Sequence, residues 1–388
     1  MDTKRRDKGE GSIYPTKRTD NHGNEITYWV AKYKSPKMTK PKVKYGKTEA
    51  EAKRILKAMK YDAIKNDYEE IRKISVKEYM DNWLNNIMVH KLKSTTFDSK
   101  ERTLKYQVYP YIGDYQIANI RPSNVQHMID SLVAENLSYS TIRKAYDCVN
   151  ASFKLGIEKK ELIENPCVGI ILPENTKKKI SNIEFFNDDE IEKVYNASIL
   201  KYRNDVPIYR LGYAIILLIY TGLRIGELLA LEWKDVDFEE KYIIVRKSAV
   251  MIKNREVGAK TKNILKMQDS TKSEHSDRIV PLSKRAIEAI TKLEKINGNF
   301  KYVMSTKSGK IINPRNVSRM LEGILVRCGI ESTGLHTCRH TFASMLFRKG
   351  VDVKTVSELM GHANVSITYN IYIHLIKEQK HQAINLFD

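Results

Sequence analysis

The sequence predicts a multidomain, mainly α-helical protein with two small β-sheets. Three observations lead to this fold class. The chain has 388 residues, more than a single domain usually holds. Apolar residues recur at helical spacing over most of its length. Short alternating runs bounded by Gly, Pro and Asn, which are typical of strands, are confined to the first 46 residues and to a stretch after residue 240.

We expect three domains. Residues 1–65 form a small three-stranded sheet with one helix, residues 74–172 a helical bundle, and residues 183–388 a mixed, mainly α-helical domain with a small sheet. Residues 173–182 join the last two. This segment contains Pro173 and the run Lys177–Lys179, so we expect a flexible linker that lets two domains close around a rod-shaped ligand.

Composition favours a globular protein with a polyanionic partner. Hydrophobic residues make up 41% of the chain and charged residues 29%, which is usual for soluble, ordered proteins. The formal net charge is +20, and the 22 tyrosines add rings for stacking and hydroxyls that donate to phosphate. Charge alone is weak evidence, because proteins of membrane surfaces and ribosomes share it.

Cysteine usage and apolar run lengths predict a cytoplasmic protein. The four cysteines form no CxxC pair and have no zinc spacing, so we expect ordinary thiols in a reducing compartment. No apolar segment follows Met1–Arg6, so we expect no signal peptide. The most apolar run, Leu211–Tyr220, is much shorter than the roughly 20 residues that span a bilayer. It predicts a buried helix, and we expect no membrane partner.

The first segment reads as three strands followed by a helix. The strand-like runs are 11–14, 27–33 and 41–46, and Thr48 with Glu51 forms a capping box for a helix over 49–65. Residues 1–65 hold 18 Lys and Arg against 8 Asp and Glu, a net charge of +10. A solubilising basic tail is the alternative, but Trp29 and the alternating apolar positions favour a folded module. We expect the sheet over 11–46 to bind DNA.

The second segment predicts four or five helices with basic polar faces. Ser75 and Glu78 form a capping box for the first helix, and later helices are expected over 94–106, 121–135 and 140–159. A charged helix face is usually no more than a solvated face, so DNA contact and simple solvation stay equally open here. The candidate DNA-binding residues are Lys91, Lys93, Lys100, Arg102, Arg143 and Lys144.

The third segment places an arginine where burial is costly. The apolar helix Leu211–Tyr220 ends at Thr221–Gly222, and Arg224 follows directly. A cation at this junction needs an anion or a carboxylate, and Glu227 can share its helix face. A structural Arg–Glu pair is therefore the alternative to a binding site. Two strands follow, over 241–246 and 277–282, and Lys272 lies in the polar stretch between them, where a lysine could reach a DNA groove.

The last segment concentrates groups that suit phosphoryl transfer. It contains His336-Thr337-Cys338-Arg339-His340, then Gly361-His362, then Ile371-Tyr372. The transition state of phosphodiester cleavage carries extra charge on its oxygens, which a planar guanidinium stabilises, and a tyrosine can act as a covalent nucleophile. No paired carboxylates lie close by to hold a metal ion. Each motif alone would more often be a surface pair or a packing residue.

Taken together and in this order, these motifs resemble those of the tyrosine recombinases, within them the phage and conjugative-transposon integrases. The motifs are Arg224-Ile225-Gly226-Glu227, Thr271-Lys272-Ser273, the His336–His340 run, Gly361-His362 and Ile371-Tyr372. The resemblance spans nearly the whole chain. It implies that residues 1–65 bind arm-type DNA sites, that 74–172 are the SAM-like core-binding domain, and that 183–388 are the catalytic domain.

The resemblance also implies the catalytic roles. Tyr372 attacks the scissile phosphate, which leaves a 3′-phosphotyrosine and a free 5′-hydroxyl, and strands are exchanged through a Holliday junction. The remaining groups act on that phosphate. Arg224 and Arg339 bind its nonbridging oxygens, His336 and His362 donate to it or carry the tyrosine proton, Lys272 protonates the 5′-oxygen, and Glu227 supports the site. Tyr369 is the alternative nucleophile, and Lys260 and Lys262 are the alternative lysines.

The partners and cofactors follow from the same resemblance. We expect double-stranded DNA with core and arm-type attachment sites, assembly to a tetramer on DNA, and an excisionase and a host DNA-bending protein as accessory factors. We expect no cofactor, no metal ion and no ATP. Two other functions stay open: a sequence-specific DNA-binding regulator without catalysis, and a recombinase that resolves chromosome dimers. The basic sheet segment over 1–65 counts against the second.

Overall fold

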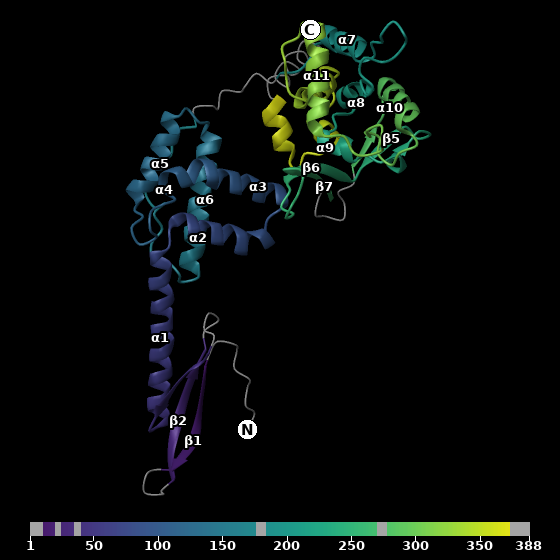
Figure 1. The fold of residues 1–388 in the computed structure, drawn as a ribbon. Coiled ribbons are helices and arrows are strands. Elements are labelled where there is room, and N and C mark those ends of the chain that lie inside the picture. The colour runs from purple at the N-terminus through teal and green to yellow at the C-terminus, as the bar shows by residue number, and fades with distance from the viewer. Residues whose placement is uncertain (1–10, 20–24, 35–39, 176–183, 270–277, 373–388) are drawn as a thin grey trace. The chain divides into compact units, whose positions relative to one another are not determined.

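The computed structural model describes residues 11–19, 25–34, 40–175, 184–269 and 278–372. It confirms a mainly helical fold with small antiparallel sheets. The chain divides into two compact units, Met1–Asn175 and Thr176–Asp388, and the boundary falls within the segment 173–182. Unit 1 and unit 2 are described separately below (Figure 1).

Unit 1 begins with the expected three-stranded sheet. β1 (Ser12–Thr19), β2 (Glu25–Tyr33) and β3 (Lys42–Gly46) are antiparallel in the order β1-β2-β3. Its small core joins Ala31 and Tyr33 of β2 to three residues of the following helix, namely Ala52, Leu56 and Met59. That helix, α1 (Glu49–Lys73), begins at the predicted cap, where the Glu51 amide donates to Thr48 Oγ1 at 3.2 Å. It continues eight residues beyond the predicted end.

The rest of unit 1 is the helical bundle. Its α-helices are α2 (Val76–Asn82), α3 (Ser94–Thr103), α4 (Tyr109–Ile112), α5 (Pro122–Ala134) and α6 (Tyr139–Glu158). Short π-helical turns at Trp83–Ile87 and Leu104–Val108 and a 3₁₀ turn at Met88–His90 connect the first of them. The predicted cap of α2 is confirmed, because the Glu78 amide donates to Ser75 Oγ at 3.1 Å. One apolar core runs through the bundle.

Unit 2 is built around one buried helix. Nearly every side chain of α8 (Tyr213–Thr221) is buried, and α7, α10 and α12 pack around it. The helices of this unit are α7 (Asp188–Ser198), α8, α9 (Ile225–Ala230), α10 (Lys284–Asn297), α11 (Pro314–Cys328), α12 (His336–Arg348) and α13 (Val353–Met360). The chain is helical again over residues 365–372. Among the described residues, every helix is too short or too polar to cross a membrane.

Unit 2 also holds two small antiparallel sheets. β4 (Val236–Asp237), β5 (Tyr242–Val245) and β8 (Arg278–Pro281) form one in the order β4-β5-β8. The predicted strands over 241–246 and 277–282 correspond to β5 and β8. The second sheet is a hairpin of β6 (Lys247–Lys253) and β7 (Asn263–Asp269) that packs on α9. The sequence predicts a polar stretch here, because only Ala249 and Ile252 are buried among the described side chains of the hairpin.

Candidate active site

A buried carboxylate organises the first half of the site. Glu227, in α9, is 5% exposed and receives both guanidinium nitrogens of Arg278, at 3.1 Å and 2.9 Å. Arg224 adds its guanidinium at 2.7 Å and its backbone amide at 2.9 Å. Burial raises the pKa of Glu227, but the hydrogen bonds and charges of Arg278 and Arg224 outweigh it and lower the pKa to about 2. The predicted Arg224–Glu227 pair is therefore present, with Arg278 as an added partner.

Arg339 is the most deeply buried cation of the site. Its side chain projects from α12 and is 3% exposed. One guanidinium nitrogen donates to the Gly222 carbonyl at 2.6 Å, and the other donates to the Met360 carbonyl. These carbonyls end α8 and α13, and helix carboxyl ends carry partial negative charge that favours a cation. Burial, followed by the charge of Arg224, lowers the pKa of Arg339 to about 9, so the group is still charged at neutral pH.

The carboxyl end of α13 brings the three arginines together. Arg278 Nε donates to the Leu359 carbonyl at 2.8 Å, and Arg224 donates to the Gly361 carbonyl at 3.1 Å. Arg339 donates to the carbonyl of Met360, which lies between those two residues in the chain. We call Arg224, Arg278, Arg339 and Glu227 the arginine cluster. Within the described part of the chain, Glu227 is the carboxylate paired with it, so three cations face one anion and the cluster keeps an excess of positive charge.

Gly361 allows this close approach. It ends α13 in the left-handed conformation, with φ of +64°, which L side chains rarely adopt. A Cβ atom at this position would lie 2.7 Å from a terminal nitrogen of Arg278 and 3.0 Å from its Cδ. The glycine therefore lets the Arg278 side chain pass directly over the turn. His362 follows this turn, so the arginine cluster also fixes the position of the His362 backbone.

Two of the predicted histidines lie within the field of these arginines. His362 Nδ1 forms a 2.7 Å hydrogen bond with Thr368 Oγ1, and its backbone amide donates to Ser357 O at 3.0 Å. Burial, reinforced by Arg339 and Arg224, lowers the pKa of His362 to about 4. Burial and the same two arginines also lower the pKa of His336, at the start of α12. The structure therefore gathers Arg224, Arg339, His336 and His362 in one place.

Tyr372 reaches the same region from the helical residues 365–372 and is completely buried. Its ring packs on Phe347, with 5.2 Å between centroids, and its hydroxyl lies 2.7 Å from His340 Nδ1. Burial raises the pKa of the phenol, and the charge of Arg339 opposes that shift. Tyr369, the alternative nucleophile, is 38% exposed on the same helical stretch.

The predicted lysine lies outside the described residues. Lys272 belongs to the connection between β7 and β8, and only its flanks are described. The alternatives Lys260 and Lys262 are exposed in the connection between β6 and β7.

The predicted DNA-binding cations of unit 1 do not all lie in the same surroundings. Lys91, Lys93, Arg102, Arg143 and Lys144 are exposed. Lys100 is instead half-buried, with its ammonium 5.5 Å from the Trp83 ring centroid and 3.8 Å from Cys148 Sγ. This inward position makes it a weaker candidate for phosphate contact than its exposed neighbours.

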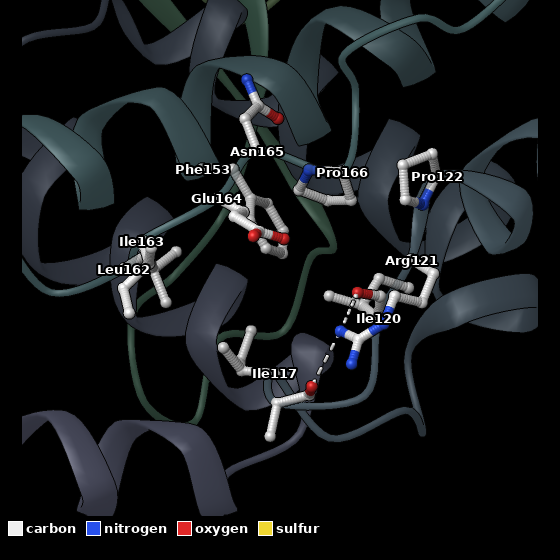
Figure 2. Close-up of a pocket in the computed structure, with 11 residues that line it drawn as sticks. Ile117, Ile120, Arg121, Pro122, Phe153, Leu162, Ile163, Glu164, Asn165 and Pro166 are labelled. Carbon is white, nitrogen blue, oxygen red and sulfur yellow. Dashed lines mark hydrogen bonds between the residues drawn. The ribbon is translucent and has the colours of Figure 1, made fainter.

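A separate cavity of about 480 Å³ lies in the bundle of unit 1 (Figure 2). Eight of its eleven lining residues have apolar side chains, and Arg121 and Glu164 are the charged ones. Arg121 donates to the Ala118 and Ile120 carbonyls at 3.0 Å and 3.2 Å, so part of its donor capacity is already used. The full lining is Ile117, Ala118, Ile120, Arg121, Pro122, Phe153, Leu162, Ile163, Glu164, Asn165 and Pro166. Chemistry on a phosphate is better served by the arginine cluster of unit 2.

The sequence reading missed three members of the site: Arg278, His340 and Thr368. Each had a signal. Arg278 opens a predicted strand, where a charged residue facing inward needs a partner. His340 stands four residues after His336, and this spacing places both on one helix face; their ring centroids are 6.3 Å apart. Thr368 lies six residues after His362, too far apart in sequence to be paired without the turn between them.

Comparison with known proteins shows the family of the chain. The sequence model of the phage integrase family matches residues 184–379, half of the chain. The chain belongs to the phage integrase family. A second match, to the N-terminal SAM-like domain of phage integrases, covers residues 75–133. The integrase family comprises tyrosine recombinases, which are DNA strand transferases, so the chain is an enzyme of DNA recombination and integration.

Relatives match most of its length. A XerC-like tyrosine recombinase of Caldanaerobacter subterraneus subsp. tengcongensis is 32% identical over 88% of this chain and 89% of its own. The Tn1549 transposon integrase in complex with transposon right end DNA shares the fold, with a TM-score of 0.64 at 20% identity over 80% of this chain and 99% of that one. A lambda integrase tetramer bound to a Holliday junction has a TM-score of 0.56 at 16% identity, over 90% and 95% of the two chains.

Proposed function

We propose that this integrase is a site-specific DNA recombinase that cuts and rejoins DNA through a 3′-phosphotyrosine intermediate and a Holliday junction. The observation that carries the proposal is the arginine cluster. Three guanidinium groups around one carboxylate leave an excess of positive charge in a largely desolvated site, where electrostatic stabilisation of a phosphoryl transition state is strong. Tyr372 lies within the field of this cluster, because the charge of Arg339 favours the ionised form of its phenol and so opposes the rise in its pKa.

Each catalytic residue has a role that its surroundings favour. Arg224 and Arg339 bind the nonbridging oxygens, since a guanidinium fork matches two phosphate oxygens. Neutral His336 and His362 donate hydrogen bonds to the same phosphate, Lys272 protonates the departing 5′-oxygen, and Glu227 holds Arg224 in place. The phenol of Tyr372 is buried, so the side chains that cover it open when the duplex binds.

Unit 1 supplies binding rather than chemistry. We assign residues 1–65 to arm-type sites, residues 74–172 to the core site, and residues 183–388 to catalysis, with 173–182 as the linker. On the sheet, Tyr14, Val30 and Tyr45 form one cross-strand row. The two tyrosines are exposed, and so is Lys32 on the same face, which offers hydroxyl and ammonium donors to phosphates. In the bundle, the exposed cations on α3 and α6 also offer hydrogen-bond donors to phosphates.

The substrate is a mobile genetic element, either a phage or a conjugative transposon. The Tn1549 transposon integrase, bound to transposon end DNA, supports the transposon, and the phage family match supports the phage. The lambda integrase tetramer on a Holliday junction supports assembly of four copies on DNA. Accessory factors, an excisionase and a host DNA-bending protein, set the direction of the reaction.

A covalent-capture assay tests this function. Purified protein is incubated in EDTA with a pool of nicked duplexes of randomised sequence, and DNA in denaturant-resistant adducts is sequenced to find the preferred site. We expect an adduct in the parent chain and none in Tyr372→Phe. Tyr369→Phe, which removes the neighbouring exposed phenol, is the matched control and keeps the adduct. An adduct that persists in Tyr372→Phe would refute the assignment. Binding without any adduct would indicate a regulator.

A further inference from the structure

The contact between Tyr372 and His340 is not explained by the roles given above. Those roles place His336 and His362 near the phosphate, yet the hydroxyl of Tyr372 is hydrogen-bonded to neither. Among the described residues, its partner is His340 Nδ1, at 2.7 Å. The two rings are 5.9 Å apart between centroids and tilted by 60°. The group in contact with the attacking oxygen is therefore the imidazole of His340, to which the sequence motifs assigned no role.

We propose that His340 is the proton acceptor for Tyr372 in DNA cleavage. This assignment rests on the proposed recombinase function and adds one step to it. The O–H of Tyr372 gives its proton to His340 Nδ1, the phenolic oxygen forms a bond to phosphorus, and the bond from phosphorus to the 5′-oxygen breaks. The departing 5′-oxygen takes a proton from the proposed acid, Lys272. In rejoining, the 5′-hydroxyl gives its proton back to Lys272 and attacks phosphorus. The bond from phosphorus to the phenolic oxygen breaks, and His340 returns its proton to that oxygen.

The surroundings of His340 suit an acceptor better than a phosphate donor. His336 and Arg339 lie near it on its own helix, and Tyr372 contacts it from the helical residues 365–372. His362, after α13, also interacts with it electrostatically. Burial, followed by the charges of His336 and Arg339, lowers the pKa of His340 to about 4, so the imidazole is neutral and keeps one free lone pair. A neutral phenol O–H pointing at that lone pair is the starting geometry for general base catalysis.

The position of His340 also gives the proton a way out. Tyr372 is completely buried, so its proton cannot pass directly to water. His340 is partly buried and His336 is exposed, and both stand on one face of α12, one helical turn apart. The two imidazoles thus lead from the buried phenol to solvent. Arg339, the residue before His340, holds the phosphate next to the same turn of α12.

The test compares His340→Phe with His336→Phe on the duplex selected in the capture assay. Single-turnover adduct formation is measured from about pH 6 to pH 8.5. Loss of a general base costs about 10²- to 10⁴-fold, so we expect His340→Phe to be slower by that factor. Its rate should rise about tenfold per pH unit, because the phenol must then ionise unaided. The parent rate should stay nearly flat over this range.

A more acidic phenol separates chemistry from damage to the fold. Fluorotyrosine at position 372 needs less help from a base, so it should restore much of the rate of His340→Phe and little of that of His336→Phe. Rescue of His336→Phe instead would make His336 the acceptor and overturn the proposal. Faster cleavage by His340→Phe would also overturn it, since the bond would then be a restraint. An inactive parent chain would refute the recombinase function itself.

Discussion

The cations of unit 1 and those of unit 2 do different work because water surrounds one set and is excluded from the other. Lys91, Lys93 and Arg102 are exposed, and the attraction of an exposed cation to a phosphate is screened by water and salt and is independent of sequence. Arg339 is 3% exposed and bonded to two helix ends. In such surroundings the same charge acts far more strongly on a nearby oxygen. Net charge thus indicates the partner, and burial indicates where the chemistry takes place.

Removing the buried cation should give the largest effect. We expect Arg339→Ala to lower the single-turnover cleavage rate by about 10²- to 10³-fold, as for the loss of one fixed oxyanion donor. Affinity for the duplex should stay within about tenfold of the parent, because exposed contacts carry most binding. Fluorescence anisotropy and adduct formation on the same duplex measure the two quantities. Equal losses in both would make Arg339 a binding residue and remove the distinction between the units.

Lowering the pH should reduce the free energy of unfolding of unit 2, because this unit buries ionisable groups. The pKa of Glu227 is lowered from 4.5 to about 2, so its ionised form contributes stability above pH 4.5 that is lost as pH falls toward 2. At about 1.4 kcal/mol per pKa unit, the loss is about 3 kcal/mol. His362, lowered from 6.5 to about 4, acts in the same direction, because the unfolded chain binds its proton first between those values.

The chain has three tryptophans, at positions 29, 83 and 233, so this loss can be measured for unit 2 alone. Urea unfolding is followed by Trp233 fluorescence in a Trp29→Phe, Trp83→Phe background at pH 7, 5 and 3. Glu227→Gln is the control, which should remove the part of the pH dependence below pH 4.5. A free energy of unfolding that stays constant from pH 7 to pH 3 would contradict the buried-charge description.

The exposed cations should affect binding alone. A Lys91→Ala, Lys93→Ala, Arg102→Ala variant should bind more weakly and reduce the slope of log affinity against log salt by about 3, at about 0.9 per phosphate contact. Its cleavage rate at saturating protein should match the parent. Lys307→Ala with Lys310→Ala, two exposed lysines of unit 2, is the control and should leave the slope unchanged. A slower cleavage step would show that these cations act in the site.

The smallest effect is expected from an alanine at Gly361, which tests how closely the arginine cluster packs on this turn. Gly361 and Gly329 both end helices with positive φ, at +64° and +68°, but a Cβ atom would meet Arg278 at the first and nothing within 4 Å at the second. Both alanine variants should lose about 1–2 kcal/mol to left-handed strain. Gly361→Ala should lose more and should also cleave DNA more slowly. Equal stability and rates in the two variants would show that Arg278 moves aside without consequence.

Local chemistry made much of the fold predictable from the sequence. The predicted helix caps at Thr48 and Ser75 are confirmed, because each N-cap oxygen accepts from a backbone amide three residues later and such signals are local in the sequence. The hairpin β6–β7 was missed because only Ala249 and Ile252 are buried among its described side chains, so its sequence resembles a polar stretch. α1 runs past its predicted end into a stretch rich in Lys, Asp and Glu that resembles a loop.

Predicting the site needed information that spacing alone does not carry. Arg224 and Glu227 are near neighbours, so their pairing was predictable. The bonds of Arg278 and Arg339 to the end of α13 join segments far apart in the chain, and only the fold brings them together. The same holds for His340 and Tyr372. Sequence motifs predicted Arg224, His336, Arg339 and His362, which the fold gathers, whereas hydrogen-bond partners and burial needed coordinates.

The most direct measurement identifies the residue that becomes attached to DNA. The adduct trapped on the selected nicked duplex is digested with nuclease and protease, and mass spectrometry locates the remaining nucleotide. We predict that the nucleotide is attached through its 3′-phosphate to Tyr372, the residue whose hydroxyl contacts His340. A nucleotide on Tyr369, or on a residue outside unit 2, would contradict the convergence of the arginine cluster and Tyr372 on one phosphorus atom.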